Sequence, residues 1–119
     1  MEGEMGYDEA LAARIRRSLG TSKRVQEKAM FDGLAFLVSG RMVCAVVNSN
    51  LMVRVGPDRY EDSLREPYVG AVGLKGAPMA GYVFVGPAGC RHDEHVAAWI
   101  DRAISYASGL KSRAAAGTA

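Results

Sequence analysis

Short turn-forming groups divide residues 25–55 into four segments, and this spacing constrains the fold more than any other feature of the chain. Asp32-Gly33, Ser39-Gly40 and Asn48-Ser49-Asn50 each stand between short runs that contain many apolar residues. Pairs of this kind tolerate the positive φ angles of the tight turns that join two antiparallel strands. The pattern therefore predicts a four-stranded antiparallel meander.

Three helices are predicted around these strands. Apolar residues recur at helical spacing from Ala10 to Leu19, with Asp8 as the expected N-cap and Gly20 as the expected end. A short helix is predicted from Pro57 to about Arg65, because proline is well suited to the first helical position. A long helix is predicted from Asp93, with apolar residues on one half of its wheel as far as Leu110.

The remaining segments complete an α+β fold. Residues 67–81 are rich in glycine and proline, and we predict irregular structure there. A fifth strand is predicted from Tyr82 to Val85. We therefore expect one domain over residues 1–110, with an antiparallel sheet of four to five strands and three flanking helices, followed by a disordered tail over residues 111–119.

The central strands indicate that both faces of the sheet are covered. Residues 34–38 and 42–47 are apolar at nearly every position, whereas a strand with one wet face alternates apolar and polar residues. Two alternatives explain the second apolar face. Either a second copy of the chain covers it in a homodimer, or the segment 67–81 folds over it.

Net charge argues against strong binding of nucleic acid. The 119 residues include 15 basic and 13 acidic side chains, which gives a formal net charge of +2. Lys111 and Arg113 account for this excess, so residues 1–110 sum to zero. Strong nucleic-acid binders carry a clearly basic surface, and we do not expect nucleic acid to be a direct strong ligand.

Hydropathy and cysteine content predict a cytoplasmic protein. The longest uninterrupted apolar run, residues 42–47, is far shorter than the ~20 residues of a membrane span. The first twenty residues carry seven charged side chains, which excludes the apolar centre of a secretory signal. Cys44 and Cys90 show no disulfide-framework spacing, and we expect both to be reduced.

One segment is locally basic. Residues 14–28 hold six basic side chains and a single acid, Glu27. Arg14, Arg17 and Lys28 are therefore candidate binding residues, and contact with nucleic acid through this segment is a weaker alternative function. The favoured interpretation is that the arginines lie on the solvated face of a helix, near its negative end.

Arg54 is a second candidate binding residue. It interrupts the apolar run from Leu51 to Val55. An arginine on a mostly apolar sheet can hold a carboxylate or phosphate of a ligand or of a partner protein. The favoured alternative is an ion pair with an acid of this chain, such as Glu27 or one within residues 58–66.

Cys90, His92 and His95 form the only candidate metal site. Thiolate and imidazole bind zinc well, but a structural zinc site takes four ligands and the usual spacings differ from this one. The favoured interpretation is a loop followed by a helix start, in which Asp93 accepts backbone hydrogen bonds. No catalytic constellation stands out, so we predict no enzymatic activity and no cofactor.

Several motifs together resemble one known family. The stretches EKAMFDGLAFLVSGRM, LMVRVGPDRYEDSL, KGAPMAGYVFV and DEHVAAWIDRAISYASGL follow one another over about residues 5–110 and resemble the N-terminal domain of the TfoX (Sxy) family of bacterial competence regulators. The resemblance implies an α+β domain with an antiparallel sheet and flanking helices that is not known to be an enzyme. It also implies a stand-alone, single-domain member.

The predicted function is that of a non-catalytic interaction or regulatory module. Its expected partners are other proteins, with a homodimer as one option. The alternative is a small-ligand or metal-binding protein that uses Arg54 or the cluster of Cys90, His92 and His95.

Overall fold

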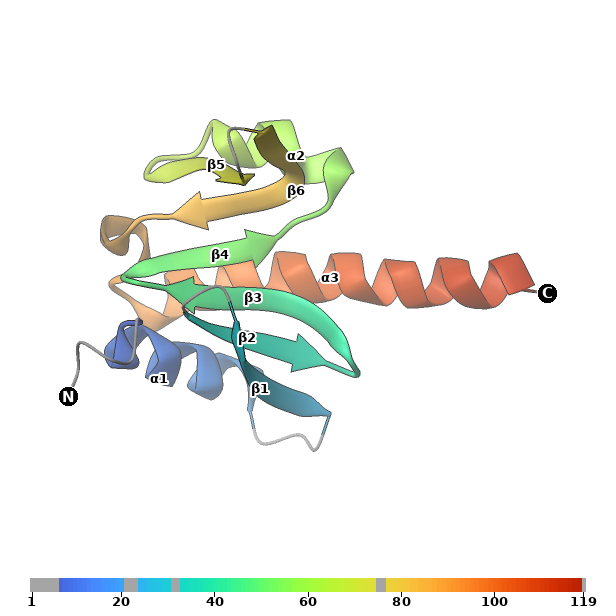
Figure 1. Cartoon of the computed structure of the whole chain (residues 1–119), viewed down its shortest axis with the longest axis horizontal. Helices are drawn as coiled ribbons and strands as arrows, with labels where there is room; N and C mark the ends of the chain where they lie inside the picture. The colour runs from blue at the N-terminus through green and yellow to red at the C-terminus, as the bar shows by residue number, and fades with distance from the viewer. Residues whose placement is uncertain (1–6, 21–23, 31–32, 75–76, 119) are drawn as a thin grey trace.

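The computed structural model describes residues 7–20, 24–30, 33–74 and 77–118, with the backbone alone for residues 30, 74, 77–78 and 110–118. It contains one six-stranded antiparallel sheet and three α-helices (Figure 1). The predicted α+β class is confirmed. The elements are α1 (Glu9–Leu19), β1 (Val25–Met30), β2 (Gly33–Val38), β3 (Arg41–Val47), β4 (Asn50–Arg54), α2 (Pro57–Leu64), β5 (Val69–Leu74), β6 (Ala77–Val85), the 3-10 turn η2 (Pro87–Cys90) and α3 (Asp93–Thr118).

The predicted meander is confirmed, because β1 to β4 lie side by side in chain order and pair antiparallel. Ser39 and Gly40 have φ angles of 53° and 82°, as a tight hairpin turn requires. The predicted place of the first turn was wrong by one residue. Gly33 already pairs with Met30 as the first residue of β2, and Asp32, the other residue of the predicted turn, lies outside the described residues.

Residues 67–81 are not irregular as predicted but form β5 and the first half of β6, so the sheet has more strands than expected. Glycines at 70 and 73 removed the apolar alternation that marks a strand. Pro78 is tolerated because it lies in the part of β6 that pairs with β5 and not with β4. Gly81, with a φ of 93°, separates that part from residues 82–85, which pair with β4; residues 83–85 pair with β5 as well.

The helices begin close to the predicted residues, and α1 and α2 also end close to them, whereas α3 is longer than predicted. The Asp8 side chain accepts hydrogen bonds from the backbone N–H groups of Ala10 (2.8 Å) and Leu11 (3.2 Å), which caps α1. Helix α2 starts with Pro57, and α3 starts with Asp93. Helix α3 continues to Thr118, past the end of the sheet (Figure 1). The disorder expected over residues 111–119 stays a prediction.

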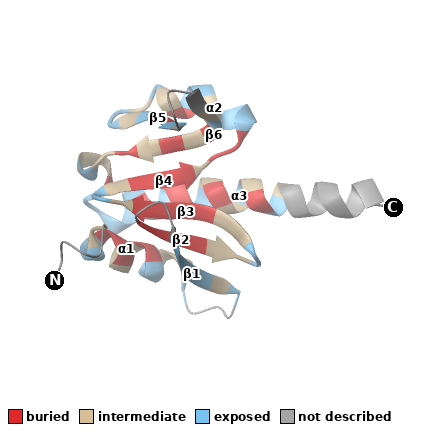
Figure 2. Cartoon of the chain, viewed as in Figure 1, coloured by how far each residue is buried: buried red, intermediate tan, exposed pale blue. Residues whose placement is uncertain are grey.

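The main core lies between one face of the sheet and helices α1 and α3. In Figure 1, α3 passes behind the strands, and Figure 2 shows the buried residues concentrated in the central strands and in the helix faces toward them. No helix of the described part of the chain is long and apolar enough to cross a membrane. The core includes Leu11, Ile15, Phe36, Val46, Leu51, Val53, Val83, Ile100 and Ala103.

A second, smaller cluster lies on the opposite face of the sheet, which we call the helix-free face. Val72 and Met79 of this cluster come from residues 67–81, so that segment contributes to the second face, but as strands and not as a covering loop. Coverage by a second copy stays a prediction. The cluster contains Ala35, Ala45, Met52 and Val72, with Leu37, Met42, Met79, Tyr82 and Phe84 packed against them.

Candidate functional site

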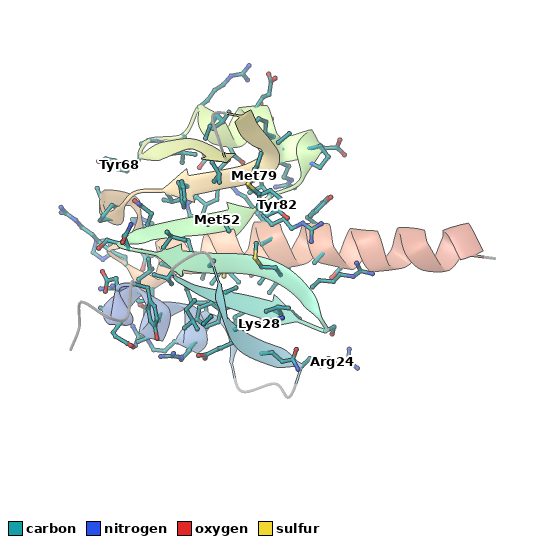
Figure 3. All side chains as sticks on the ribbon, in the orientation of Figure 1. Arg24, Lys28, Met52, Tyr68, Met79 and Tyr82 are labelled. Carbon is teal, nitrogen blue, oxygen red and sulfur yellow. The ribbon has the colours of Figure 1, made fainter. Side chains whose placement is uncertain are left out.

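The helix-free face is organised by the register of the strands. Lys28 is opposite Ala35, Ala35 opposite Ala45, Ala45 opposite Met52, and Met52 opposite Phe84. These five residues therefore form one row across the sheet, and Figure 3 shows Lys28 and Met52 within it. Neighbouring strands lie about 4.8 Å apart, which places Lys28 about 14 Å from Met52.

Larger apolar side chains form the outer surface of this face. Ala35 and Ala45 are fully buried and Met52 is 3% exposed, because their larger neighbours shield them. Leu37, Met42, Met79, Tyr82 and Phe84 are only half-buried and meet solvent. Methionine side chains adapt to differently shaped partners and are frequent at binding surfaces. The face thus has the composition of a contact surface.

Lys28 is the basic residue at the β1 end of this face. Its side chain is exposed, and no described residue forms an ion pair with it. The neighbouring Glu27 points to the other face, where it accepts hydrogen bonds from Arg16 Nε (2.7 Å) and Nη2 (2.9 Å). These bonds lower the pKa of Glu27. Alternation along the strand thus separates the acid from Lys28.

Arg54 is the second basic residue of this face and ends β4. Its guanidinium carbon lies 5.7 Å from the ring centre of Tyr82 and 5.3 Å from that of Tyr106 in α3. The expected ion pair with Glu27 or with an acid of residues 58–66 is wrong, because none of the described residues pairs with Arg54. Two aromatic rings stabilise the cation and leave its N–H groups available to an external carboxylate or phosphate.

Arg14 and Arg17 lie on α1, on the side of the sheet opposite the helix-free face, and both interact with Asp93 at the start of α3. Arg17 donates to Asp93 through Nε and Nη2, both at 3.0 Å, and Arg14 Nε lies 3.6 Å from the same carboxylate. The three residues connect α1 to the start of α3. These hydrogen bonds, led by those from Arg17, hold the pKa of Asp93 below its ordinary value.

Replacing Asp93 by asparagine is expected to lower the melting temperature modestly at pH 7. A carboxylate with a lowered pKa stabilises the fold above its ordinary pKa, and this contribution is lost as the pH falls through the lowered value. The difference in melting temperature between wild type and Asp93→Asn should therefore disappear at acidic pH. Thermal unfolding measured from pH 7 to pH 2.5 tests this, and a gap that stays constant would contradict the assignment.

The structure does not bring Cys90, His92 and His95 together as ligands. The Cys90 side chain is 3% exposed, and its Sγ lies 3.8 Å from the carbonyl oxygen of Val85. Burial raises the pKa of this thiol to about 11. The two histidine rings are exposed and meet edge to face, 5.2 Å apart. Within the described ranges no three His, Cys, Asp or Glu side chains are placed to hold a metal ion.

Cys44 offers no nucleophile either. It is completely buried in β3, and burial raises its pKa. The Asp93 carboxylate was expected to accept backbone hydrogen bonds, but it accepts hydrogen bonds from the Arg17 side chain instead.

Two open cavities lie next to α3. One, of about 230 Å³, is lined mainly by apolar residues, with Arg41 among the polar ones, and the other, of about 260 Å³, lies between Tyr68 and Trp99. Arg54 lines neither of them. Neither of these two cavities is therefore a site for a ligand held by Arg54.

Sequence reasoning named Lys28 and Arg54 as candidate binding residues. From the unbroken apolar character of residues 34–38 and 42–47, which include Leu37 and Met42, it also inferred that a second face of the sheet is covered. It did not place Tyr82 and Phe84 of β6 on that face, because only the pairing of β6 with β4 shows this.

The comparisons with known proteins agree with this architecture. The TfoX N-terminal domain family matches residues 17–107, from the second half of α1 to the packed part of α3. Neither the curated proteins nor the solved structures gave a match. The matched region includes the whole sheet, and with it Lys28 and Arg54. The match spans well over half of this chain, which therefore belongs to the TfoX N-terminal domain family.

Proposed function

We propose that the domain is a non-catalytic regulatory module that binds a partner protein through the helix-free face. The observation that carries this proposal is the composition of that face. Half-buried Leu37 and Met42 lie on β2 and β3, between the strands that carry the cations Lys28 and Arg54, and half-buried Phe84 lies on the next strand, β6. Neither cation has an acidic partner among the described residues. The TfoX N-terminal domain family supports a regulatory role in general terms.

Charge defines the partner more closely. The strand positions of the helix-free face that the structure describes carry Lys28 and Arg54 and no acid. The complementary partner is a protein segment whose apolar side chains are flanked by carboxylates. Electrostatic complementarity of this kind increases the association rate and fixes the orientation of the partner.

Thiol chemistry supports the absence of catalysis and a cytoplasmic location. Both cysteines are free and buried, and their raised pKa values leave very little thiolate at neutral pH. Free thiols are typical of a reducing compartment.

A double charge reversal tests the proposal. The tagged protein is isolated from its own cells as wild type, as Lys28→Glu/Arg54→Glu, and as the matched control Arg59→Glu/Arg91→Glu, whose residues are exposed on α2 and after η2. We expect the same partner with wild type and control, and at least tenfold less of it with the face variant. Circular dichroism verifies that all three proteins fold.

Equal recovery with the face variant would contradict the proposal, and so would equal loss with the control variant. Raising the salt concentration should also weaken the wild-type complex, because partly exposed charges are screened.

A second candidate function, the binding of a small anion at Arg54, is favoured by the position of its guanidinium between Tyr82 and Tyr106. Native mass spectrometry of the gently isolated protein distinguishes the two. A defined small added mass that disappears in Arg54→Gln supports the small ligand, and a retained protein subunit supports the module.

A further inference from the structure

The two edge strands of the sheet differ in how well they are protected against pairing with a strand of another molecule. Strands β1 and β5 lie at the ends of the strand order (Figure 1). An edge strand presents unpaired backbone N–H and C=O groups to any other strand, and proteins block this with charged residues or proline. Strand β1 carries Glu27 and Lys28, whereas β5, with the sequence VGAVGL, has neither a charge nor a proline.

Strand β1 is unsuited to pairing with a second copy of itself. Directly opposite residues of an antiparallel pair share a face, so a symmetric pair centred on Glu27 places this residue opposite Glu27 of the second copy. A pair centred on Lys28 places two lysines opposite each other. Both central registers therefore bring like charges together.

Strand β5 brings no like charges together in a symmetric pair. A symmetric pair can be centred on Gly70 or on Ala71. In both registers, the β5 residues that lie opposite each other are only glycine, alanine and valine. Gly70, Ala71 and Gly73 are exposed, and a Cβ atom added at Gly70 would meet no atom within 4 Å. The bulge between Ala71 and Gly73 leaves Val69 to Ala71 as the regular part of this open edge.

Tyr68, the residue before β5, provides an independent observation. It is 63% exposed and is the only large hydrophobic side chain in the described part of the chain that is mostly exposed to solvent (Figure 3). Its φ angle is 67°, a backbone conformation that a bulky residue rarely adopts. The N–H of Gly86 donates to its carbonyl oxygen at 2.8 Å and holds it in place. The fold thus directs an aromatic ring into solvent at the start of the open edge.

We propose that two copies of this chain pair antiparallel through β5 and form one continuous sheet. The proposal joins the two observations: the uncharged edge supplies backbone hydrogen bonds, and Tyr68 of each copy packs beside the edge of the other. A two-fold axis perpendicular to the sheet keeps both helix-free faces on the same side. The dimer is therefore compatible with the proposed function and does not depend on it.

Paired lysine substitutions test the dimer on the full chain. Ala71 in β5 and Ala29 in β1 are both exposed alanines of edge strands, so Ala71→Lys and Ala29→Lys make the same chemical change at the two edges. We expect light scattering to show a dimer for wild type and Ala29→Lys at micromolar concentration. Ala71→Lys should be monomeric, with a dissociation constant at least tenfold higher. The two lysines would lie directly opposite each other in the register centred on Ala71 and would be diagonal neighbours in the register centred on Gly70.

Two further variants keep the test decisive. Gly70→Lys adds a charge at a position where an added Cβ meets no atom, and this variant should also be monomeric. It therefore distinguishes loss of the dimer from a folding defect specific to Ala71→Lys. Tyr68→Ser should weaken the dimer while the circular dichroism spectrum stays unchanged. A monomeric wild type would overturn the inference, and so would equal dissociation by Ala71→Lys and Ala29→Lys. Neither outcome affects the partner test with Lys28 and Arg54.

Discussion

Replacing Phe36 by alanine is expected to lower the free energy of unfolding by about 3–5 kcal/mol. Phe36 is fully buried in β2, on the face covered by α1 and α3, and it is the largest fully buried side chain. The cost combines lost transfer energy with the cavity that remains. Since domains of this size are stable by about 5–15 kcal/mol, much of the stability would be lost. Urea denaturation followed by circular dichroism measures the change.

Phe84 provides the matched control, because it is the same residue type on the opposite face of the sheet. It is only half-buried and contacts the smaller cluster. Phe84→Ala should cost about 1–2 kcal/mol, since less apolar area is returned to water. If both variants lost the same stability, Phe84 would be as deeply buried in solution as Phe36, and our description of Phe84 as half-buried on an accessible face of the chain would be wrong.

Replacing Gly33 by alanine should cost about 3 kcal/mol, although the added group is a single methyl. A Cβ atom at this position would collide with the carbonyl oxygen of Val46 on β3. Both strands are held in the ladder, so neither backbone can move without breaking the pairing of Leu34 with Val46. Thermal unfolding should show a melting temperature lower by about 10 °C.

Gly70→Ala is the control for this substitution. Gly70 is also a strand glycine without a positive φ angle, but an added Cβ there meets no atom within 4 Å. Its melting temperature should stay within about 2 °C of the wild type, because surface substitutions have small effects. A Gly33→Ala protein as stable as the Gly70→Ala protein would show that β2 and β3 are farther apart at Gly33 than described.

Local signals predicted the elements that local chemistry determines. Asp8 identified the start of α1 because a carboxylate can satisfy free N–H groups only at a helix N-terminus. Ser39-Gly40 identified a hairpin because few residues accept two successive positive φ angles. The helical period beginning at Asp93 predicted α3 because one face of it packs against the sheet.

Features that depend on contacts distant in sequence could not be predicted in this way. Asp93 and Arg17 are 76 residues apart, so no local pattern indicates that they pair. Gly33 was read as a turn residue because its function, to allow close approach of β3, becomes visible only in the assembled sheet. Strand β5 was missed because its glycines are typical of loops, and pairing with β6 overrides that preference.

The candidate site was predicted in part for the same reason. Lys28 and Arg54 were selected from composition, but only the register of β1 to β4 shows that they share a face. The aromatic neighbours of Arg54 come from β6 and α3, which no spacing in the sequence connects.

The most direct test of the central claim is photocrosslinking in living cells, with a photoreactive phenylalanine analogue at Leu37 on the helix-free face or at Ser105 on the exposed side of α3. We expect the protein with the analogue at Leu37 to form a covalent product with one other protein. That product should be lost in the Lys28→Glu/Arg54→Glu background, and the Ser105 position should not form it. A product formed equally from Ser105, or one that persists after the charge reversal, would contradict the assignment of the helix-free face as the partner-binding surface.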